Sequence, residues 1–306
     1  MDAFEYIVAT MQQQEGNRDR SSRQDLYIHS RVTRTIVTKI LACVNLKGGV
    51  GKTAIAVNFA AYCGMKGLKT ALIDLDPQTN ATIWCMGFER WEDHAKKQGT
   101  VADLLGAKHY TSAEGKPRDV GSVIVKSVFE NVDLIPSHVD LFAVDLDLAA
   151  ATARETRLLR AFQPVKKDYD IVVCDCPPNL TIPTQNALAL SSYYVVPVSP
   201  DFLSGLGVGL LLKRVKELSD DLDNPLKHVG IIISRMGRRA AHREGIVKAL
   251  RERFPDQVFE VEIKERVKVS EAAENSKSIF QMGDVEAAKE FEAISLELLK
   301  RMEVSV

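Results

Sequence analysis

Two lysines stand five residues apart in a glycine-rich stretch, residues 47–53, which reads K-G-G-V-G-K-T. The end of this stretch matches the phosphate-binding pattern G-x-x-x-x-G-K-[ST], but Leu46 occupies the position of the first glycine. In such a loop the lysine, here Lys52, neutralises the β- and γ-phosphates, and the hydroxyl, here that of Thr53, ligates Mg²⁺. Lys47 is a second cation that the pattern does not require.

The surroundings of this loop are typical of a phosphate-binding site. An apolar run over residues 40–45 predicts a strand before the loop, and a helix is predicted from about residue 53. Glycines would let backbone N–H groups approach phosphate oxygens, and the helix N-terminus would add its dipole. The alternative is a glycine turn that carries a lysine by chance. The candidate nucleotide-binding residues of the loop are Gly48, Gly49, Val50, Gly51, Lys52, Thr53 and Ala54.

Short apolar runs alternate with helical patterns along the rest of the chain. Runs that are apolar throughout suit parallel strands buried on both faces, and the helical stretches between them suit crossovers. The predicted fold is therefore α/β, a doubly wound, mostly parallel sheet flanked by helices, with its ligand at the carboxyl ends of the strands. The predicted strands span residues 40–45, 70–75, 132–135, 171–175, 194–198, 229–234 and 258–263.

The N-terminal residues 1–39 differ from this pattern. Apolar residues recur at helical spacing between residues 4 and 11 and predict one short amphipathic helix. Residues 16–39 hold six basic and two acidic side chains, which is typical of a mobile basic linker. We therefore expect two parts, an N-terminal helix with its linker over residues 1–39 and one domain with the phosphate-binding loop over residues 40–306.

Composition narrows the possible classes of protein. The 306 residues carry 40 basic and 41 acidic side chains, so a nucleic-acid surface would have to be a local patch. No apolar run approaches the roughly 18 residues of a membrane span, and no signal-peptide pattern opens the chain. Five cysteines are too few for a disulfide framework. We expect a cytoplasmic protein.

The K-G-G-V-G-K-T stretch resembles the deviant Walker A motif of the ParA/MinD family of P-loop ATPases. The resemblance implies that Lys47 reaches across a dimer interface to the phosphates of the partner's nucleotide, while Lys52 acts on the nucleotide of its own subunit. It implies an ATP-dependent homodimer, with two ATP molecules between facing subunits, and ATP and Mg²⁺ as cofactors. A slow ATP hydrolase follows from it.

Two further segments extend the resemblance over residues 40–279. The segment A-L-I-D-L-D-P-Q-T-N-A-T resembles the family's second motif, which implies that Asp76 orients the attacking water; the alternative is a simple turn at the end of a strand. The segment D-Y-D-I-V-V-C-D-C-P-P-N-L resembles the family's Walker B motif, which implies that Asp175 holds Mg²⁺ through water. By the same resemblance, Pro200 and Asp201 approach the adenine base.

Two cysteines, Cys174 and Cys176, flank Asp175 on one side of a predicted strand. They could be metal or iron–sulfur ligands, but no other C-x-x-C pair and no nearby histidine completes a ligand set. We expect buried structural thiols.

Basic side chains gather in residues 227–253, where eight stand against two acidic ones; residues 254–306 hold seven basic and twelve acidic. Residues 264–272, K-E-R-V-K-V-S-E-A, resemble the ParA segment that carries DNA-contacting residues. A solvated helix face is the alternative to a DNA-binding surface. The candidate DNA-binding residues are Arg235, Arg238, Arg239, Arg243, Arg266 and Lys268.

Three functions from different classes fit these features. The best supported is a ParA-like ATPase that dimerises with ATP, binds nonspecific DNA, and segregates or positions cargo, with hydrolysis stimulated by a ParB-like adaptor. Such a protein would associate with the nucleoid when ATP is bound. A MinD-like membrane switch would need a basic amphipathic C-terminus, which the helix predicted over residues 285–302 does not provide. A metabolic or redox P-loop protein would need substrate or cluster ligands.

Overall fold

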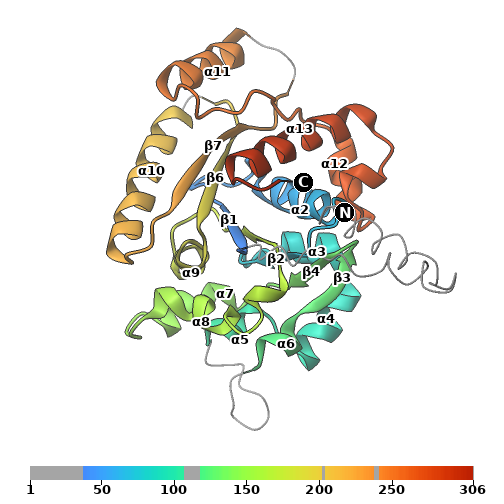
Figure 1. Cartoon of the computed structure of the whole chain (residues 1–306), viewed down its shortest axis with the longest axis vertical. Helices are drawn as coiled ribbons and strands as arrows, with labels where there is room; N and C mark the ends of the chain where they lie inside the picture. Colours follow the sequence, from blue (N-terminus) through green and yellow to red (C-terminus); the bar gives the residue numbers. More distant parts are fainter. Residues whose placement is uncertain (1–36, 107–117, 202–203, 238–240, 306) are drawn as a thin grey trace, which may run out of the picture. The chain divides into compact units, whose positions relative to one another are not determined.

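A seven-stranded sheet forms the centre of the chain, in the order β3-β4-β2-β5-β1-β6-β7 (Figure 1). The computed structural model describes residues 37–106, 118–201, 204–237 and 241–305. All strand pairings are parallel except that of β3 with β4. The strands are β1 (Lys39–Cys43), β2 (Thr70–Asp74), β3 (Val125–Phe129), β4 (Val132–Ile135), β5 (Ile171–Asp175), β6 (Tyr193–Val198) and β7 (Lys227–Ile233).

Helices lie on both faces of this sheet. One layer consists of α2 (Lys52–Met65), α3 (Asn80–Met86), α12 (Val267–Glu274) and α13 (Val285–Arg301). The other layer consists of α5 (Val101–Leu105), α6 (Val120–Val123), α7 (Leu141–Asp147), α8 (Arg157–Phe162), α9 (Ile182–Leu190), α10 (Ser204–Asp221) and α11 (Ala241–Arg253). The remaining elements are α4 (Phe88–Lys97), η3 (Arg154–Thr156), η4 (Lys166–Asp168) and η5 (Ile279–Gln281).

The central strands are apolar because each face of the sheet is covered. In β1, Ile40 and Ala42 belong to the core beneath α9, whereas Leu41 and Cys43 belong to the core beneath α2. Successive side chains of a strand point to opposite faces, so a strand between two helical layers reads as a continuous apolar run. Helix α2 is apolar almost all round for the same reason, since it lies between the sheet and α13.

The predicted α/β fold is confirmed, with two local differences. Strand β3 was not predicted, since it is a partly exposed antiparallel strand at the edge of the sheet. Residues 258–263 were predicted as a strand, but they form one isolated bridge, between Val258 and Ile231 of β7. The Arg251 guanidinium donates hydrogen bonds to two carbonyl oxygens there, those of Phe259 (3.0 Å) and Glu260 (3.1 Å). Two backbone carbonyl groups of the segment are therefore hydrogen-bonded to a side chain and not to a neighbouring strand.

The predicted C-terminal helix is present and packs on the core. Phe291, Ile294 and Leu298 of α13 are buried against the layer that contains α2. Within the described residues, no helix is both long enough and apolar enough to cross a membrane. The predicted N-terminal helix lies outside the described residues, so the boundary at residues 39 and 40 stays a prediction.

Gly64 marks the closest approach between α2 and the turn that joins β3 to β4. A Cβ atom at this position would lie 2.0 Å from the Glu130 carbonyl oxygen and 2.7 Å from the Val132 side chain. The obstacle is backbone, which cannot turn aside as a side chain can. The phosphate-binding loop is the N-terminal end of this same helix, so the contact also fixes the axis on which the loop is built.

We therefore expect Gly64→Ala to reduce the free energy of unfolding by about 2–4 kcal/mol, since overpacking against backbone forces a helix to shift. Gly245→Ala is the matched control, because Gly245 also lies in a helix but has open space around it. That change should be neutral or stabilise the protein by about 0.5–1 kcal/mol. Denaturant unfolding of both variants measures the difference, and equal stabilities would contradict the assigned contact.

Candidate nucleotide site

A cavity of about 570 Å³ opens beside the N-terminus of α2, where β1 ends. A volume of this size suits a small-molecule ligand. One wall is the glycine-rich loop, a second is the loop after β2, and the third is the segment over residues 263–273. The residues of this lining used below are Gly48, Gly49, Gly51, Lys52, Thr53, Ala54, Asp76, Pro178, Ser234, Arg235, Glu265 and Arg266.

The glycine-rich loop is held in place from β7. Gly51, which precedes α2, has a φ of 82°, a left-handed conformation that favours glycine. The Ser234 hydroxyl donates to the Val50 carbonyl oxygen, and Arg235 Nη1 donates to that of Gly49 at 2.7 Å. Both contacts use carbonyl oxygens. They fix the loop while sparing its amide N–H groups, which are the groups that bind phosphate at a helix N-terminus.

The two lysines of the loop lie in different environments. Lys52 is 6% exposed, lines the cavity, and donates from Nζ to the Lys47 carbonyl oxygen at 3.1 Å. Burial lowers the pKa of Lys52, and nearby Asp175 acts in the opposite direction. The Lys47 side chain is 54% exposed and forms an ion pair with Asp201 of the same chain. The buried lysine is therefore placed to act inside the cavity, and the exposed one is not.

Asp175 is a buried carboxylate without hydrogen-bond partners. It ends β5, is 0% exposed, and neither of its carboxylate oxygens accepts a hydrogen bond. Burial and the neighbouring Asp74 raise its pKa well above the usual range, whereas Thr53 and Lys52 favour the charged form. Orphaned carboxylate oxygens beside a hydroxyl are the kind of ligand set that a hydrated divalent cation takes. The residues at this position fit Mg²⁺.

Asp76 lies at the opposite wall of the cavity, in the loop after β2. It is 7% exposed, and its Oδ1 accepts from the Gln78 N–H at 2.9 Å. A carboxylate on the cavity wall is placed to accept a proton or a hydrogen bond from a ligand. The predicted Lys52, Thr53 and Asp76 thus line one cavity, whereas Asp175 is fully buried beside Thr53 and Lys52 and is not part of the lining. Pro200 and Asp201, predicted to approach adenine, do not belong to its lining among the described residues.

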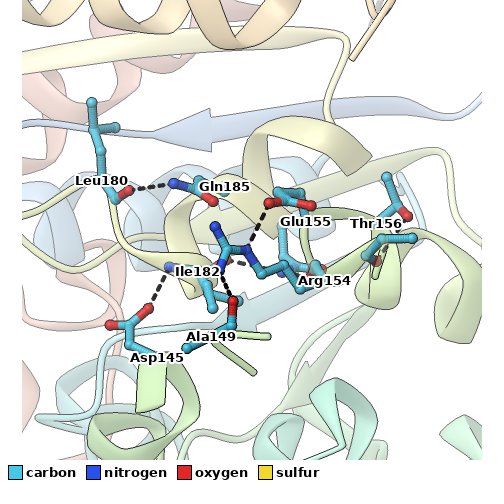
Figure 2. A network of polar contacts seen from close by, with 10 residues as sticks. Asp145, Ala149, Arg154, Glu155, Thr156, Leu180, Ile182 and Gln185 are labelled. Carbon is cyan, nitrogen blue, oxygen red and sulfur yellow. Dashed lines mark hydrogen bonds and ion pairs between the residues drawn. The ribbon is translucent and has the colours of Figure 1, made fainter. Parts of the chain in front are cut away.

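The loop that follows Asp175 is anchored to the helical layer beneath it (Figure 2). The Ile182 N–H donates to Asp145 Oδ1 of α7 at 2.7 Å, and Gln185 Nε2 donates to the Leu180 carbonyl oxygen at 2.9 Å. At its start, Pro178 faces Gly48 across the cavity mouth. This loop therefore joins the mouth of the cavity to α7.

Three of the predicted DNA-binding residues that the structure describes, Arg235, Arg266 and Lys268, pair with acidic side chains. Arg235 and Arg266 line the cavity, and each pairs with an acid, Arg235 with Glu265 at 2.6 Å and Arg266 with Glu290 at 2.8 Å. Lys268 pairs with Glu271 on α12. Acids of residues 254–306 thus pair with part of the basic stretch 227–253, namely Lys227, Arg235 and Arg251.

Three of the predicted DNA-binding arginines follow β7. The Arg243 guanidinium lies against Gly237. Arg238 and Arg239 lie outside the described residues. The sequence did not predict the roles of Ser234 and Glu265 or the contact of Arg235 with the loop. Each depends on a hydrogen bond to a residue far away in the sequence.

All five cysteines are buried and free of disulfides. For Cys174 and Cys176, the prediction of buried thiols is confirmed. Burial raises the pKa of Cys174 to about 12, so this sulfur stays protonated at neutral pH. Burial also raises the pKa of Cys176.

Comparisons with known proteins agree with this site. A family model described as AAA domain matches residues 38–228. The sporulation initiation inhibitor protein Soj of Bacillus subtilis is 33% identical over 241 residues, which cover 79% of this chain and 90% of that protein. The chromosome-partitioning ATPase Soj of Treponema pallidum is 33% identical over 264 residues, 86% of this chain and 98% of that one.

A solved structure has a similar fold. The putative plasmid partition protein of Borrelia burgdorferi, bound to AMPPNP, superposes with a TM-score of 0.70 at 25% identity. The match covers 86% of this chain and 99% of that one. The relatives indicate the same family as the glycine-rich loop with its two lysines and the aspartates at the strand ends. The chain belongs to the ParA/Soj-like family of deviant Walker A ATPases.

Proposed function

We propose that this partitioning or positioning ATPase closes into a homodimer around two ATP molecules, each contacted by both subunits. The observation that carries the proposal is the contrast between its two loop lysines. Lys52 is buried in its own cavity, and Lys47 is exposed beside that cavity. A cation that a subunit does not use for its own ligand is available to a second subunit, and closure would exclude water and strengthen its effect.

ATP would bind with its phosphates against the loop and Lys52, and Mg²⁺ would neutralise phosphate charge. Thr53 and Asp175, the latter through water, would hold the ion, since Asp175 has no other partner. Asp76 would orient the attacking water from the opposite wall. Phosphoryl transfer requires little of a protein beyond such positioning and charge neutralisation.

Lys47 must leave Asp201 to reach a partner's phosphates. The ion pair lies on the surface, where exposed pairs contribute about 0–1 kcal/mol, so a phosphate-rich ligand can compete for the lysine. Exchange of Asp201 for a partner's nucleotide would link dimer formation to ATP. Pro200 and Asp201 would then take part in closure of the dimer. The contact with the adenine base that we propose for them would depend on the loop that holds both residues.

Two substitutions should separate hydrolysis from dimer formation. Asp76→Ala should bind ATP and form a long-lived dimer. Its hydrolysis rate should fall about 10²-fold or more, as expected for the loss of a positioned catalytic group. Lys47→Ala should retain ATP binding as a monomer and fail to dimerise. Light scattering after size-exclusion chromatography, with and without ATP, measures both outcomes.

Lys52→Ala is the comparison for Lys47→Ala, because it removes a loop lysine that acts in its own cavity. It should weaken nucleotide binding itself, which a fluorescent ATP analogue reports. A Lys47→Ala protein that still dimerises with ATP would place Lys47 in its own subunit's site and remove the basis for a shared one.

We further propose that the ATP-bound dimer binds DNA without sequence preference, through phosphate contacts from the arginines that follow β7. Support comes from the local basic excess in residues 227–253 and from Soj of T. pallidum, a chromosome-partitioning ATPase. Arg238, Arg239 and Arg243 are the favoured contacts, because they stand close together in this basic stretch of the sequence. Arg235 and Arg266, two further candidates, pair with acids at the cavity. Lys268 is a further candidate on α12.

Dimer formation would double the number of phosphates that the protein neutralises, so DNA binding should need ATP and weaken as salt rises. Removing both charges with Arg238→Ala and Arg239→Ala should make the log–log salt slope shallower by about 0.9 for each phosphate that is no longer neutralised, while the dimer persists. Arg214→Ala with Lys216→Ala, two exposed cations of α10, is the matched control. Titration of unrelated duplexes in the Asp76→Ala background measures the slope. Binding that ignores nucleotide and salt would rule out this role.

A ParB-like or other adaptor would stimulate hydrolysis and release the dimer from DNA, in the cytoplasm. A MinD-like membrane role is the second candidate. It is disfavoured by α13, whose apolar side chains Phe291, Ile294 and Leu298 are already buried in the core and so are not available to a lipid surface.

A further inference from the structure

Asp76 is held by a closed ring of buried hydrogen bonds. Its N–H donates to Asp74 Oδ1 at 3.0 Å, and its carbonyl oxygen accepts from the Ser137 hydroxyl at 2.6 Å. The Ser137 N–H donates to Thr82 Oγ1 at 2.8 Å, and Thr82 Oγ1 donates to Asp74 Oδ2 at 2.7 Å. Side chains from three separate segments thus fix both backbone groups of one residue.

The three members of the ring that hold Asp76 are inaccessible to water. Asp74, Thr82 and Ser137 are all 0% exposed. Ser137 uses every polar group that it has, since its carbonyl oxygen accepts from Trp91 Nε1 at 2.9 Å. Buried networks in which every group is satisfied rigidify the segment that they hold, because no member can move without leaving a partner unpaired.

The loop that carries Asp76 needs such fixing. It leaves β2 and turns within a few residues into α3, and Thr79 adopts a positive φ of 57°, which is unfavourable for a β-branched residue. The Asp76 carboxylate itself has one hydrogen bond, from Gln78 of the same loop. The position of the carboxylate in the cavity therefore depends on its backbone, and its backbone depends on the ring.

We infer that Ser137 and Thr82 are positioning residues for hydrolysis, which act through Asp76 without touching the nucleotide. Neither belongs to the lining of the cavity. Ser137 follows β4, whose carboxyl end lies next to that of β2, so the ring transmits the position of a neighbouring strand to the loop. This inference rests on the role proposed for Asp76.

Ser137→Ala should lower the single-turnover rate constant of ATP hydrolysis about tenfold, since displacement of a catalytic group by a fraction of an ångström is costly. The affinity for a fluorescent ATP analogue should not change, because no group that faces the nucleotide is removed. Ser295→Ala is the matched control. Ser295 is 1% exposed and its hydroxyl also donates to a carbonyl oxygen, that of Phe291 at 2.7 Å, but it lies on α13 outside the site.

A second pair of variants tests the ring if Ser137→Ala folds poorly. Thr82→Val keeps the shape and removes the hydroxyl, whereas Thr82→Ser keeps the hydroxyl and removes a methyl group. The rate constant should fall in Thr82→Val and be largely kept in Thr82→Ser. Equal losses in the two variants would assign Thr82 to packing.

The sharpest test places Ser137→Ala in the Asp76→Ala background. If Ser137 acts through the Asp76 carboxylate, the double variant should hydrolyse ATP no more slowly than Asp76→Ala, so the two effects should not add. A further tenfold loss, or a loss of analogue binding, would overturn the inference. If Asp76→Ala hydrolyses ATP slowly but Ser137→Ala hydrolyses it at the normal rate, only the inference about Ser137 is overturned. If Asp76→Ala hydrolyses ATP like the wild type, the proposed role of Asp76 is overturned as well.

Discussion

Buried charge at the carboxyl ends of β1, β2 and β5 is the constraint on which the rest of the structure depends. Asp74 and Asp175 are fully buried beside one buried lysine, Lys52, and burial raises the pKa of Asp74 to about 7. Asp74 is satisfied by hydrogen bonds, but Asp175 is not. In a low dielectric, one lysine compensates the negative charge of two carboxylates poorly, so the nucleotide-free site favours the binding of a cation. Stability is sacrificed here for binding, as is common at functional sites.

The surrounding fold supplies rigid supports for this charge. Helix α2 is locked to the sheet at Gly64, its first turn is tied to β7 through Ser234 and Arg235, and the loop of Asp76 is fixed by the ring around Ser137. The loop after Asp175 has a different kind of support, since it connects the cavity mouth to α7. The glycine-rich loop and the loop of Asp76 are therefore positioned by buried contacts with the sheet and its neighbouring segments.

The sequence predicted the parts of this site that are continuous along the chain. The glycine-rich loop, the strand-end aspartates and the parallel sheet all follow from local patterns, because loop, strand and helix adjoin in order. Ser137 could not be found in this way, since its bonding partners lie 55 and 61 residues away. The charge pairing of the basic stretch could not be predicted for a related reason. Arg235 and Arg251 meet acids supplied by a later segment, which a count of charges along the chain cannot show.

Mixed dimers test most directly whether one subunit holds only part of each catalytic site. Lys47→Ala protein retains Asp76, and Asp76→Ala protein retains Lys47, so a dimer of the two contains one complete site. Each variant alone should be nearly inactive, and an equal mixture should recover ATPase activity, since each mixed two-fold dimer has one of its two sites intact. A mixture as inactive as its components would show that Lys47 does not act on the partner's nucleotide, and would contradict the shared site.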